Sequence, residues 1–154
     1  QSKLIEDWAD TTMASTCKKV LIKSALENPK LRSALLPDDF PSSIKGVIDK
    51  LPFNNVSKLS NIVLSNKNNI ELQNILEALS NALINKKFLI GDSLSIADIS
   101  ISAQLSLLKF PTSAGPTLAG EGCQEFINNP YLENIFKWRD NLEELIFSAK
   151  SQEI

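Results

Sequence analysis

The stretch FLIGDSLSIADISISAQLSLL, residues 88–108, carries two conflicting signals about secondary structure. From Ile99 to Leu107 apolar and polar residues alternate strictly, which is typical of a half-buried strand. Just before them, Ser95 and Asp98 have the spacing of a capping box, which begins a helix. A single strand among helices would leave buried amides without partners, so we predict that this stretch is a helix.

On a helix, at about 100° per residue, the same stretch presents apolar side chains on two faces. One face holds Ile99, Ala103, Leu107 and Phe110, and the other holds Ile101, Leu105 and Leu108. We therefore expect a central helix that is buried on two sides, with serines that let its neighbours approach. Leu94 and Ile99 are placed as the hydrophobic staple that accompanies the cap.

Three further helices are predicted from apolar residues at helical spacing. The first spans residues 3–27 and ends at Asn28-Pro29. The second has Asn68 as N-cap and Glu71 at N3. The last begins at Asn129-Pro130, and its expected apolar stripe consists of Tyr131, Ile135, Trp138, Leu142, Leu145 and Ala149. With residues 111–125 expected as a Gly- and Pro-rich loop, the predicted fold class is all-α.

The composition is that of an ordinary globular domain, because 43% of the 154 residues are hydrophobic and 22% are charged. This length suits one compact unit, so we expect residues 1–154 to form a single helical domain. Within it, residues 29–69 are interrupted by prolines and are expected to form an irregular helical insert. Short helical pieces are predicted there at 31–36, 43–50 and 56–65.

Charge and hydropathy exclude two classes of partner. The 16 basic and 18 acidic residues leave a net charge of −2, and no Lys/Arg block is present, so nucleic acid is not an expected partner. No apolar run approaches the roughly 20 residues that span a bilayer. Residues 1–10 also lack the pattern of a signal peptide, so no membrane association is expected.

The chain contains no histidine, which excludes Ser-His and Cys-His nucleophiles and the commonest metal ligand. Cys17 and Cys123 lie far apart without a CxxC spacing, so neither a metal site nor a redox dithiol is predicted. Both suit the reducing cytoplasm, where we expect the protein to act. Cys17 lies on an apolar stripe and is expected to be inert, whereas Cys123, in the Gly-rich loop, is the better candidate for an exposed thiol.

The segment FLIGDSLSIADI, with the capping pair Ser95 and Asp98, resembles the signature of the C-terminal all-helical domain of the glutathione transferase superfamily. The long first helix, which begins LIEDWAD, and the closing NPYLENIFKWRDNL are similar to the same domain. The resemblance implies a helical bundle of that type. Residues 29–69 do not match the family's pattern.

In that family the helical domain is joined to an N-terminal thioredoxin-like domain that binds glutathione and activates its thiol. No such half is present within these 154 residues. The resemblance therefore implies that this domain forms the wall for the hydrophobic substrate and part of a subunit interface. It also implies that the domain holds no cofactor, that glutathione is the co-substrate of a full-length parent, and that its partners are the thioredoxin-like domain and, in a homodimer, a second copy.

The candidate site residues follow from the resemblance and from the cap. Trp8, Thr12 and Ser15 lie on the first helix, which faces the substrate in the family, and are the candidate substrate-binding residues. The residues by themselves favour core packing of Trp8 and ordinary exposure of the two hydroxyls. Asp98 could be read as a catalytic acid, but its spacing from Ser95 is that of a cap, so both are assigned a structural role and no catalytic residue is predicted.

A rival interpretation belongs to another class of function. Similar helical domains serve as non-catalytic interaction modules in the gamma subunit of a translation elongation factor and on some aminoacyl-tRNA synthetases. The residues of this chain are compatible with such a protein-protein interaction module as well as with the domain of a transferase.

Overall fold

The computed structural model describes residues 1–37, 41, 46 and 66–150. Within these ranges the chain forms helices and no strands, which confirms the predicted all-α class. No helix in this described part is both long and apolar enough to cross a membrane. The helical pieces predicted at 43–50 and 56–65 lie outside the described residues, apart from Gly46.

The first helix is continuous in direction but changes its winding midway. It consists of α1 (Ser2–Trp8), the π-helical segment η1 (Ala9–Met13) and α2 (Ala14–Glu27), in agreement with the predicted helix over 3–27. Asn28 then ends α2 and begins α3 (Pro29–Ala34), because its side-chain oxygen accepts hydrogen bonds from the amides of Lys30 and Leu31 at 3.0 and 3.3 Å. Both the stop at Asn28-Pro29 and a short helix in this region are confirmed.

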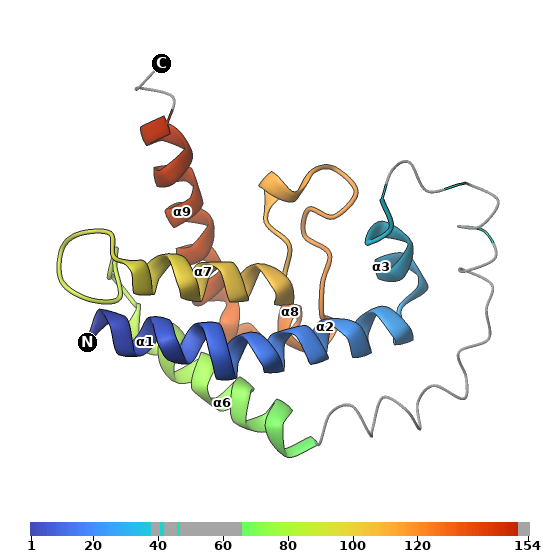
Figure 1. Ribbon diagram of the computed structural model, residues 1–154, viewed down its shortest axis with the longest axis horizontal. Helices are drawn as coiled ribbons and strands as arrows, with labels where there is room; N and C mark the ends of the chain where they lie inside the picture. The colour runs from blue at the N-terminus through green and yellow to red at the C-terminus, as the bar shows by residue number, and fades with distance from the viewer. Residues whose placement is uncertain (38–40, 42–45, 47–65, 151–154) are drawn as a thin grey trace.

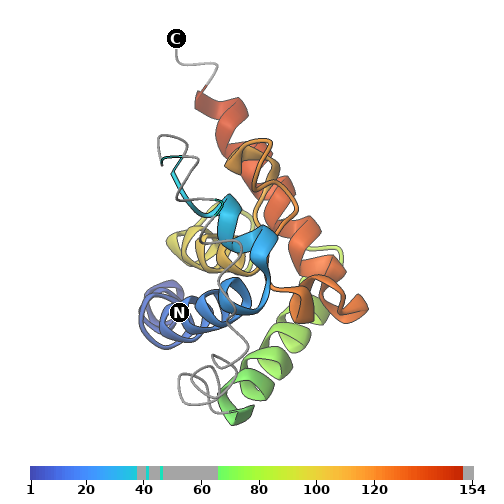
Figure 2. The same ribbon diagram turned by 90° about the vertical axis from the view of Figure 1, so that its right-hand side faces the viewer.

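Three other helices surround the core beside the first helix. They are α6 (Asn66–Ala82), α7 (Ile96–Leu108) and α9 (Glu133–Lys150). In Figure 1, α7 runs alongside α1 and α2, which it contacts over most of its length. Figure 2, turned by 90°, shows α6 and α9 on the other side, where α6 packs against both α2 and α9 and α7 also contacts α9. The four helices therefore close around one shared interior.

The core contains apolar side chains from all four helices and from the connection between α7 and α9. That connection includes η3 (Thr112–Ala114), α8 (Gln124–Ile127) and η4 (Pro130–Leu132). The most deeply buried apolar members are Ala9, Met13, Cys17, Leu76, Ile101, Leu105, Leu108, Cys123, Phe126, Leu132 and Ile135. Burial of these side chains is the main favourable term in folding, at about 25 cal/mol per Å² of apolar surface removed from water.

Within residues 88–108 the predicted helix forms as α7, which begins after the cap at Ser95, but only one of its two predicted apolar faces is fully buried. Ile101, Leu105 and Leu108 face the core, whereas Ile99 is 43% exposed and Ala103 is exposed. The same face is half-buried at Leu107, which packs against the core, and at Phe110. The expectation of a second buried face is therefore wrong for the first half of the helix and met in part towards its end. Alternation of residue types identifies two apolar faces, but it does not show whether a neighbouring element covers both of them.

Of the predicted starts of the two remaining helices, one is wrong and one is confirmed. The expected cap at Asn68 is wrong, because α6 already includes Asn66. The predicted start of the last helix is confirmed: the side-chain oxygen of Asn129 accepts from the amide of Tyr131 at 2.9 Å, with Pro130 in the first turn. Tyr131 itself is exposed rather than part of the apolar stripe, because it lies in η4, before α9 begins at Glu133.

The loop after α7 returns to the end of that helix. The amide of Cys123 donates to the carbonyl of Leu108 at 2.8 Å, and so satisfies one of the carbonyls that a helix leaves free at its end. Gly122 lies against this carbonyl at a φ of 153°. A Cβ atom at this position would lie 2.3 Å from the Leu108 oxygen. Only glycine fits here without moving the backbone.

We therefore expect Gly122→Ala to lower the free energy of unfolding by about 2–4 kcal/mol, from the clash and the positive φ together. Gly120→Ala is the matched control, because Gly120 also has a positive φ of 78° but has open space around it. Its cost is expected to be about 1–2 kcal/mol. Urea unfolding measures both variants, and equal losses would contradict the close contact at Gly122.

Candidate functional site

A groove between the first helix and α6 is the candidate functional site. Its cavity has a volume of about 210 Å³. The residues that line it come from two elements: Trp8, Thr12, Met13 and Thr16 from the first helix, and Glu71, Leu72 and Ile75 from α6. The structure thus brings two of the three predicted substrate-binding residues, Trp8 and Thr12, to one cavity.

The π-helical segment explains why the third predicted residue does not line the cavity. On a regular α-helix, at about 100° per residue, Ser15 would lie within about 20° of Trp8 and Thr16 about 80° away. A π-helical turn adds one residue, which shifts every later residue back by about one position. Thr16 therefore takes the place that regular spacing assigns to Ser15, and Ser15 is exposed and outside the lining.

Threonine hydroxyls donate hydrogen bonds to backbone carbonyls in and next to the π-helical segment. The hydroxyl of Thr11 donates to the carbonyl of Asp7 at 2.6 Å, and that of Thr16 donates to the carbonyl of Thr12 at 3.0 Å. The amide of Ala14 reaches back to the carbonyl of Ala9, five residues earlier. Hydroxyl bonds of this kind compete with the regular backbone ladder and often bend helices. They satisfy one carbonyl just before η1, at Asp7, and one within it, at Thr12.

The groove has the chemistry of a binding surface for an apolar group. Met13 and Leu72 form its buried floor, and Trp8 is half-buried beside them. The hydroxyl of Thr12 stands at the exposed rim. Glu71 supplies the one charge among the described lining residues. These side chains can hold and orient a ligand, but none of them forms a nucleophile and base pair.

Asp98, the capping residue, is fully buried at the start of α7 and is 0% exposed. One carboxylate oxygen accepts from the amide of Leu89 at 2.7 Å, and the other accepts from the amide and the hydroxyl of Ser95 at 2.8 and 2.6 Å. Ser95 and Asp98 thus form the capping box. Both bonds of the predicted box are present, because the side chain of Ser95 also accepts from the amide of Asp98.

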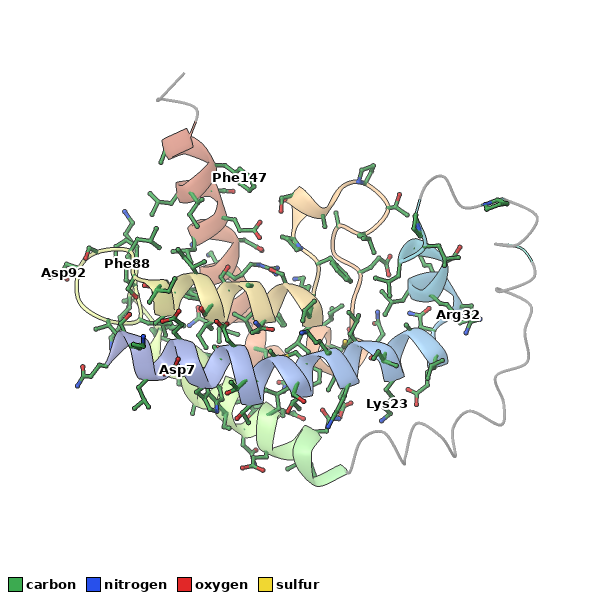
Figure 3. All side chains as sticks on the ribbon, viewed as in Figure 1. Asp7, Lys23, Arg32, Phe88, Asp92 and Phe147 are labelled. Atoms are coloured by element: carbon green, nitrogen blue, oxygen red, sulfur yellow. The ribbon has the colours of Figure 1, made fainter. Side chains whose placement is uncertain are left out.

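The bond to Leu89 makes this carboxylate more than a cap. Figure 3 shows the loop that leads into α7, with Phe88 turned towards the helices and Asp92 at the outer bend. Asp98 holds this loop by Leu89 and the first turn of the helix by Ser95. Because the carboxylate is buried and accepts three hydrogen bonds, it is a structural tie between two segments rather than an acid that meets a ligand.

Both cysteines lie in the core. Cys17 is buried as predicted, whereas the expectation that Cys123 is exposed is wrong, because it is 0% exposed. Burial raises the pKa of Cys17 to about 12, and the nearby Cys123 adds to the shift. Burial also raises the pKa of Cys123 to about 11. The Gly-rich composition of the loop misled the prediction, because the loop folds back onto α7 at this residue.

Arg139 is a buried residue that the sequence analysis missed. It is 0% exposed on α9, and its Nη1 donates to the carbonyl of Lys109 at 2.6 Å and to the hydroxyl of Ser106 at 3.1 Å. Its Nε donates to Asp140 at 2.7 Å. The guanidinium therefore ties α9 to the end of α7. The signal in the sequence is its place one turn after Ile135 on the apolar side of the helix.

In the part of the chain that the structure describes, no three Asp, Glu or Cys side chains come together in a way that could hold a metal ion. Comparisons with known protein families, with curated proteins and with solved structures found no match to this chain. The geometry of the described residues is therefore the basis for assigning a function.

The role of Asp98 can be tested by substitution. Asp98→Ala leaves the amides of Leu89 and Ser95 without partners, and we expect a loss of about 3 kcal/mol in the free energy of unfolding. Asp98→Asn is also expected to be harmful, because one accepting oxygen becomes an NH₂ group that faces a donor. Ser95→Ala should lower the free energy of unfolding by about 1 kcal/mol. The Ser95→Ala/Asp98→Ala double variant should lose less than the sum of the two single losses. Urea unfolding measures all four, and wild-type stability of Asp98→Asn would contradict the assignment.

The thiols provide a pH-dependent prediction. Because burial raises their pKa from 9.0, Cys17 and Cys123 stay protonated in the folded chain at about pH 8, and dithionitrobenzoate should label them only after unfolding. Above about pH 9 the unfolded chain releases thiol protons that the folded chain retains, so stability falls as the pH rises. The Cys17→Ala/Cys123→Ala variant should lack the part of this loss of stability that the thiols cause. Fast labelling of the folded protein at about pH 8 would be the opposing result.

Proposed function

We propose that this chain is the helical domain of a glutathione transferase-like protein, and that the groove between the first helix and α6 holds the hydrophobic part of an electrophilic substrate. The all-α arrangement and the capped helix α7 are compatible with this proposal. The cytoplasm, where glutathione is abundant and thiols stay reduced, is the location that goes with it.

The observation that carries the proposal is the meeting of Trp8 and Thr12 at one groove. The family resemblance implies both as substrate-binding residues, and both line the cavity of about 210 Å³. An aromatic ring beside a buried apolar floor, with hydroxyls at the rim, suits a flat organic molecule. The volume is small, so the groove would take an aryl group or a short alkyl chain rather than a whole large ligand.

In the proposed reaction the thiolate of glutathione attacks an electrophilic carbon of the bound compound and forms a C–S bond, while the bond from that carbon to its leaving group, such as chloride on an aryl chloride, breaks and the leaving group departs as an anion. Glutathione and its activating residue would be supplied by a thioredoxin-like domain. The groove would contribute position, because holding the electrophile at a fixed place and angle lowers the entropic cost of the encounter. Glu71 would disfavour anionic substrates at this groove, so a neutral or cationic aryl compound is the substrate class that fits.

A non-catalytic interaction module is the second candidate, and one observation favours it. Leu94, Ile96 and Ile99 are each at least 40% exposed around the start of α7. Neighbouring exposed apolar side chains are a feature of surfaces that contact other proteins. In the transferase proposal this surface would contact the thioredoxin-like domain or a second copy in a homodimer, whereas in the interaction module it would bind a different protein.

The groove can be tested with N-phenylnaphthylamine, a neutral fluorescent aryl amine. Thr12→Phe places a ring at the exposed rim of the groove and is expected to weaken binding of this probe by about tenfold, which corresponds to about 1.4 kcal/mol. Ser15→Phe is the matched control, since Ser15 is exposed on the same helix but outside the lining. Circular dichroism checks that both variants are folded. Equal affinities in the two variants would remove the groove from the proposal.

Thr12→Phe and Ser15→Phe also distinguish the two proposed functions when they are introduced into the full protein expressed in cells. As a transferase, the protein should conjugate glutathione to chlorodinitrobenzene, and Thr12→Phe should raise KM for the aryl compound while Ser15→Phe should not. As an interaction module, it should show no turnover with either variant. Turnover that is unchanged in Thr12→Phe would show that the electrophile binds elsewhere.

A further inference from the structure

A second cavity, with a volume of about 420 Å³, lies between the turn after α6 and the helix α9. Three lysines line it: Lys86 and Lys87 come from the turn, and Lys137 comes from α9. No carboxylate is present among its described lining residues. The whole chain has a net charge of −2, so this cavity concentrates positive charge on a protein that is otherwise slightly acidic.

The buried Trp138 connects the turn that carries Lys86 and Lys87 to α9, which carries Lys137. The indole Nε1 of Trp138 donates to the backbone carbonyl of Lys87 at 3.0 Å, which fixes the turn against α9. The ammonium group of Lys87 lies 5.5 Å from the centre of the Phe88 ring, within the range of a cation–π contact. The positions of Lys86, Lys87 and Lys137 around the cavity therefore follow from the packing of the helices.

The bottom of the cavity is apolar. Leu83, Trp138 and Leu142 are buried, and each borders the cavity from below. Leu145 adds a half-buried apolar wall further along α9. A ligand that reaches this floor would remove apolar surface from water, which is favourable at about 25 cal/mol per Å².

The rim also carries amide groups that can complete the polar contacts. Asn85 and Asn141 are exposed and line the cavity beside the lysines. Asn85 has a φ of 61°, and within the described ranges it is the one non-glycine residue with a positive φ. Asparagine tolerates this conformation better than most residues, and here it turns the chain out of α6 so that Lys86 and Lys87 follow at the rim.

We propose that this cavity binds an organic anion with an apolar body, such as an aryl or alkyl carboxylate or sulfonate. The cavity has three ammonium groups and no carboxylate among its described lining residues, which favours negative charge, and the floor of Leu83, Trp138 and Leu142 selects an apolar body. The volume of about 420 Å³ falls in the range of pockets for small organic ligands. The lysines are exposed and screened by salt, so a bare inorganic anion would bind weakly.

This site is separate from the groove at Trp8 and Thr12, with which it shares no lining residue. The two cavities also differ in the sign of their charge, since the groove is lined by Glu71 and this cavity by lysines. The proposal goes beyond the proposed function, because it assigns a second ligand class to a second place on the same domain.

The test uses two probes that differ by one charged group. Anilinonaphthalene sulfonate has an anionic sulfonate, and N-phenylnaphthylamine is its neutral counterpart. In a Trp8→Phe background, Trp138 is the remaining tryptophan, so probe emission on tryptophan excitation reports binding near Trp138. We expect the sulfonate to give this signal and to lose affinity as the salt concentration rises.

Lysine variants test the charge recognition. Lys86→Gln and Lys137→Gln should each weaken binding of the sulfonate by about twofold to fivefold, and the double variant should weaken it by about tenfold. Lys18→Gln is the matched control, because Lys18 is exposed on α2 and does not line the cavity. Binding of the neutral amine should be unchanged in all four lysine variants. Circular dichroism confirms that the exposed substitutions leave the fold intact.

Two results would overturn the proposal. One is wild-type affinity of the sulfonate in the Lys86→Gln/Lys137→Gln variant. The other is displacement of the sulfonate by an equal concentration of inorganic phosphate, which would show that the apolar body contributes nothing. Thr12→Phe keeps this test distinct from that of the groove, since it should weaken the neutral amine and leave the sulfonate unaffected. Loss of sulfonate binding in Thr12→Phe would assign both probes to the groove and reject the second site.

Discussion

The buried carboxylate of Asp98 is the constraint on which the arrangement of the core depends. An ionised group without partners is costly in an apolar interior, so its bonds to Leu89 and Ser95 must be present in the folded state. Those bonds fix where α7 begins and where the preceding loop lies. With its start fixed, α7 directs Ile101 and Leu105 into the space between the other helices. A single side chain thus fixes the N-terminal end of the central helix.

Two further hydrogen bonds, from different parts of the chain, hold the opposite end of α7. Arg139 reaches from α9 to the carbonyl of Lys109, and the returning loop brings the amide of Cys123 to the carbonyl of Leu108. Free carbonyls at a helix end need such partners when water is excluded. α7 is therefore tied at both ends, while its surface at Ile99 stays exposed. The hydrogen bonds at its two ends fix where α7 lies along its own axis, but part of its surface stays uncovered.

Much of this fold could be predicted from the sequence, because caps and apolar periodicity are local signals. The helix starts at Ser95 and Asn129 and the stop at Asn28 were found in this way. The burial of Cys123 could not be predicted, because it depends on a contact with α7 that is distant in sequence. The burial of Arg139 was missed although its place one turn after Ile135 indicates the apolar side of α9. The exposure of Ile99 and Ala103 on α7 was missed because local periodicity identifies apolar faces but not the elements that cover them.

The π-helical segment was missed although the sequence contains a signal for it. Ile5, Ala9, Met13 and Cys17 follow one another in steps of four, and on a regular α-helix this pattern drifts by about 120° over three steps. All four nevertheless pack against one core. The extra residue of η1 removes about 100° of the drift, so a run of steps of four is itself an indication of π-helical winding.

The two cavities suggest how one helical domain can separate its ligands. The described residues offer little chemistry of their own, since Asp98 is saturated with hydrogen bonds and both thiols keep their protons at neutral pH. What the domain does offer is two apolar floors with rims of opposite charge, at Glu71 and at Lys86, Lys87 and Lys137. Like charges at a rim repel a ligand before it reaches the floor. A neutral aryl compound and an organic anion would therefore bind at different places, and neither would displace the other.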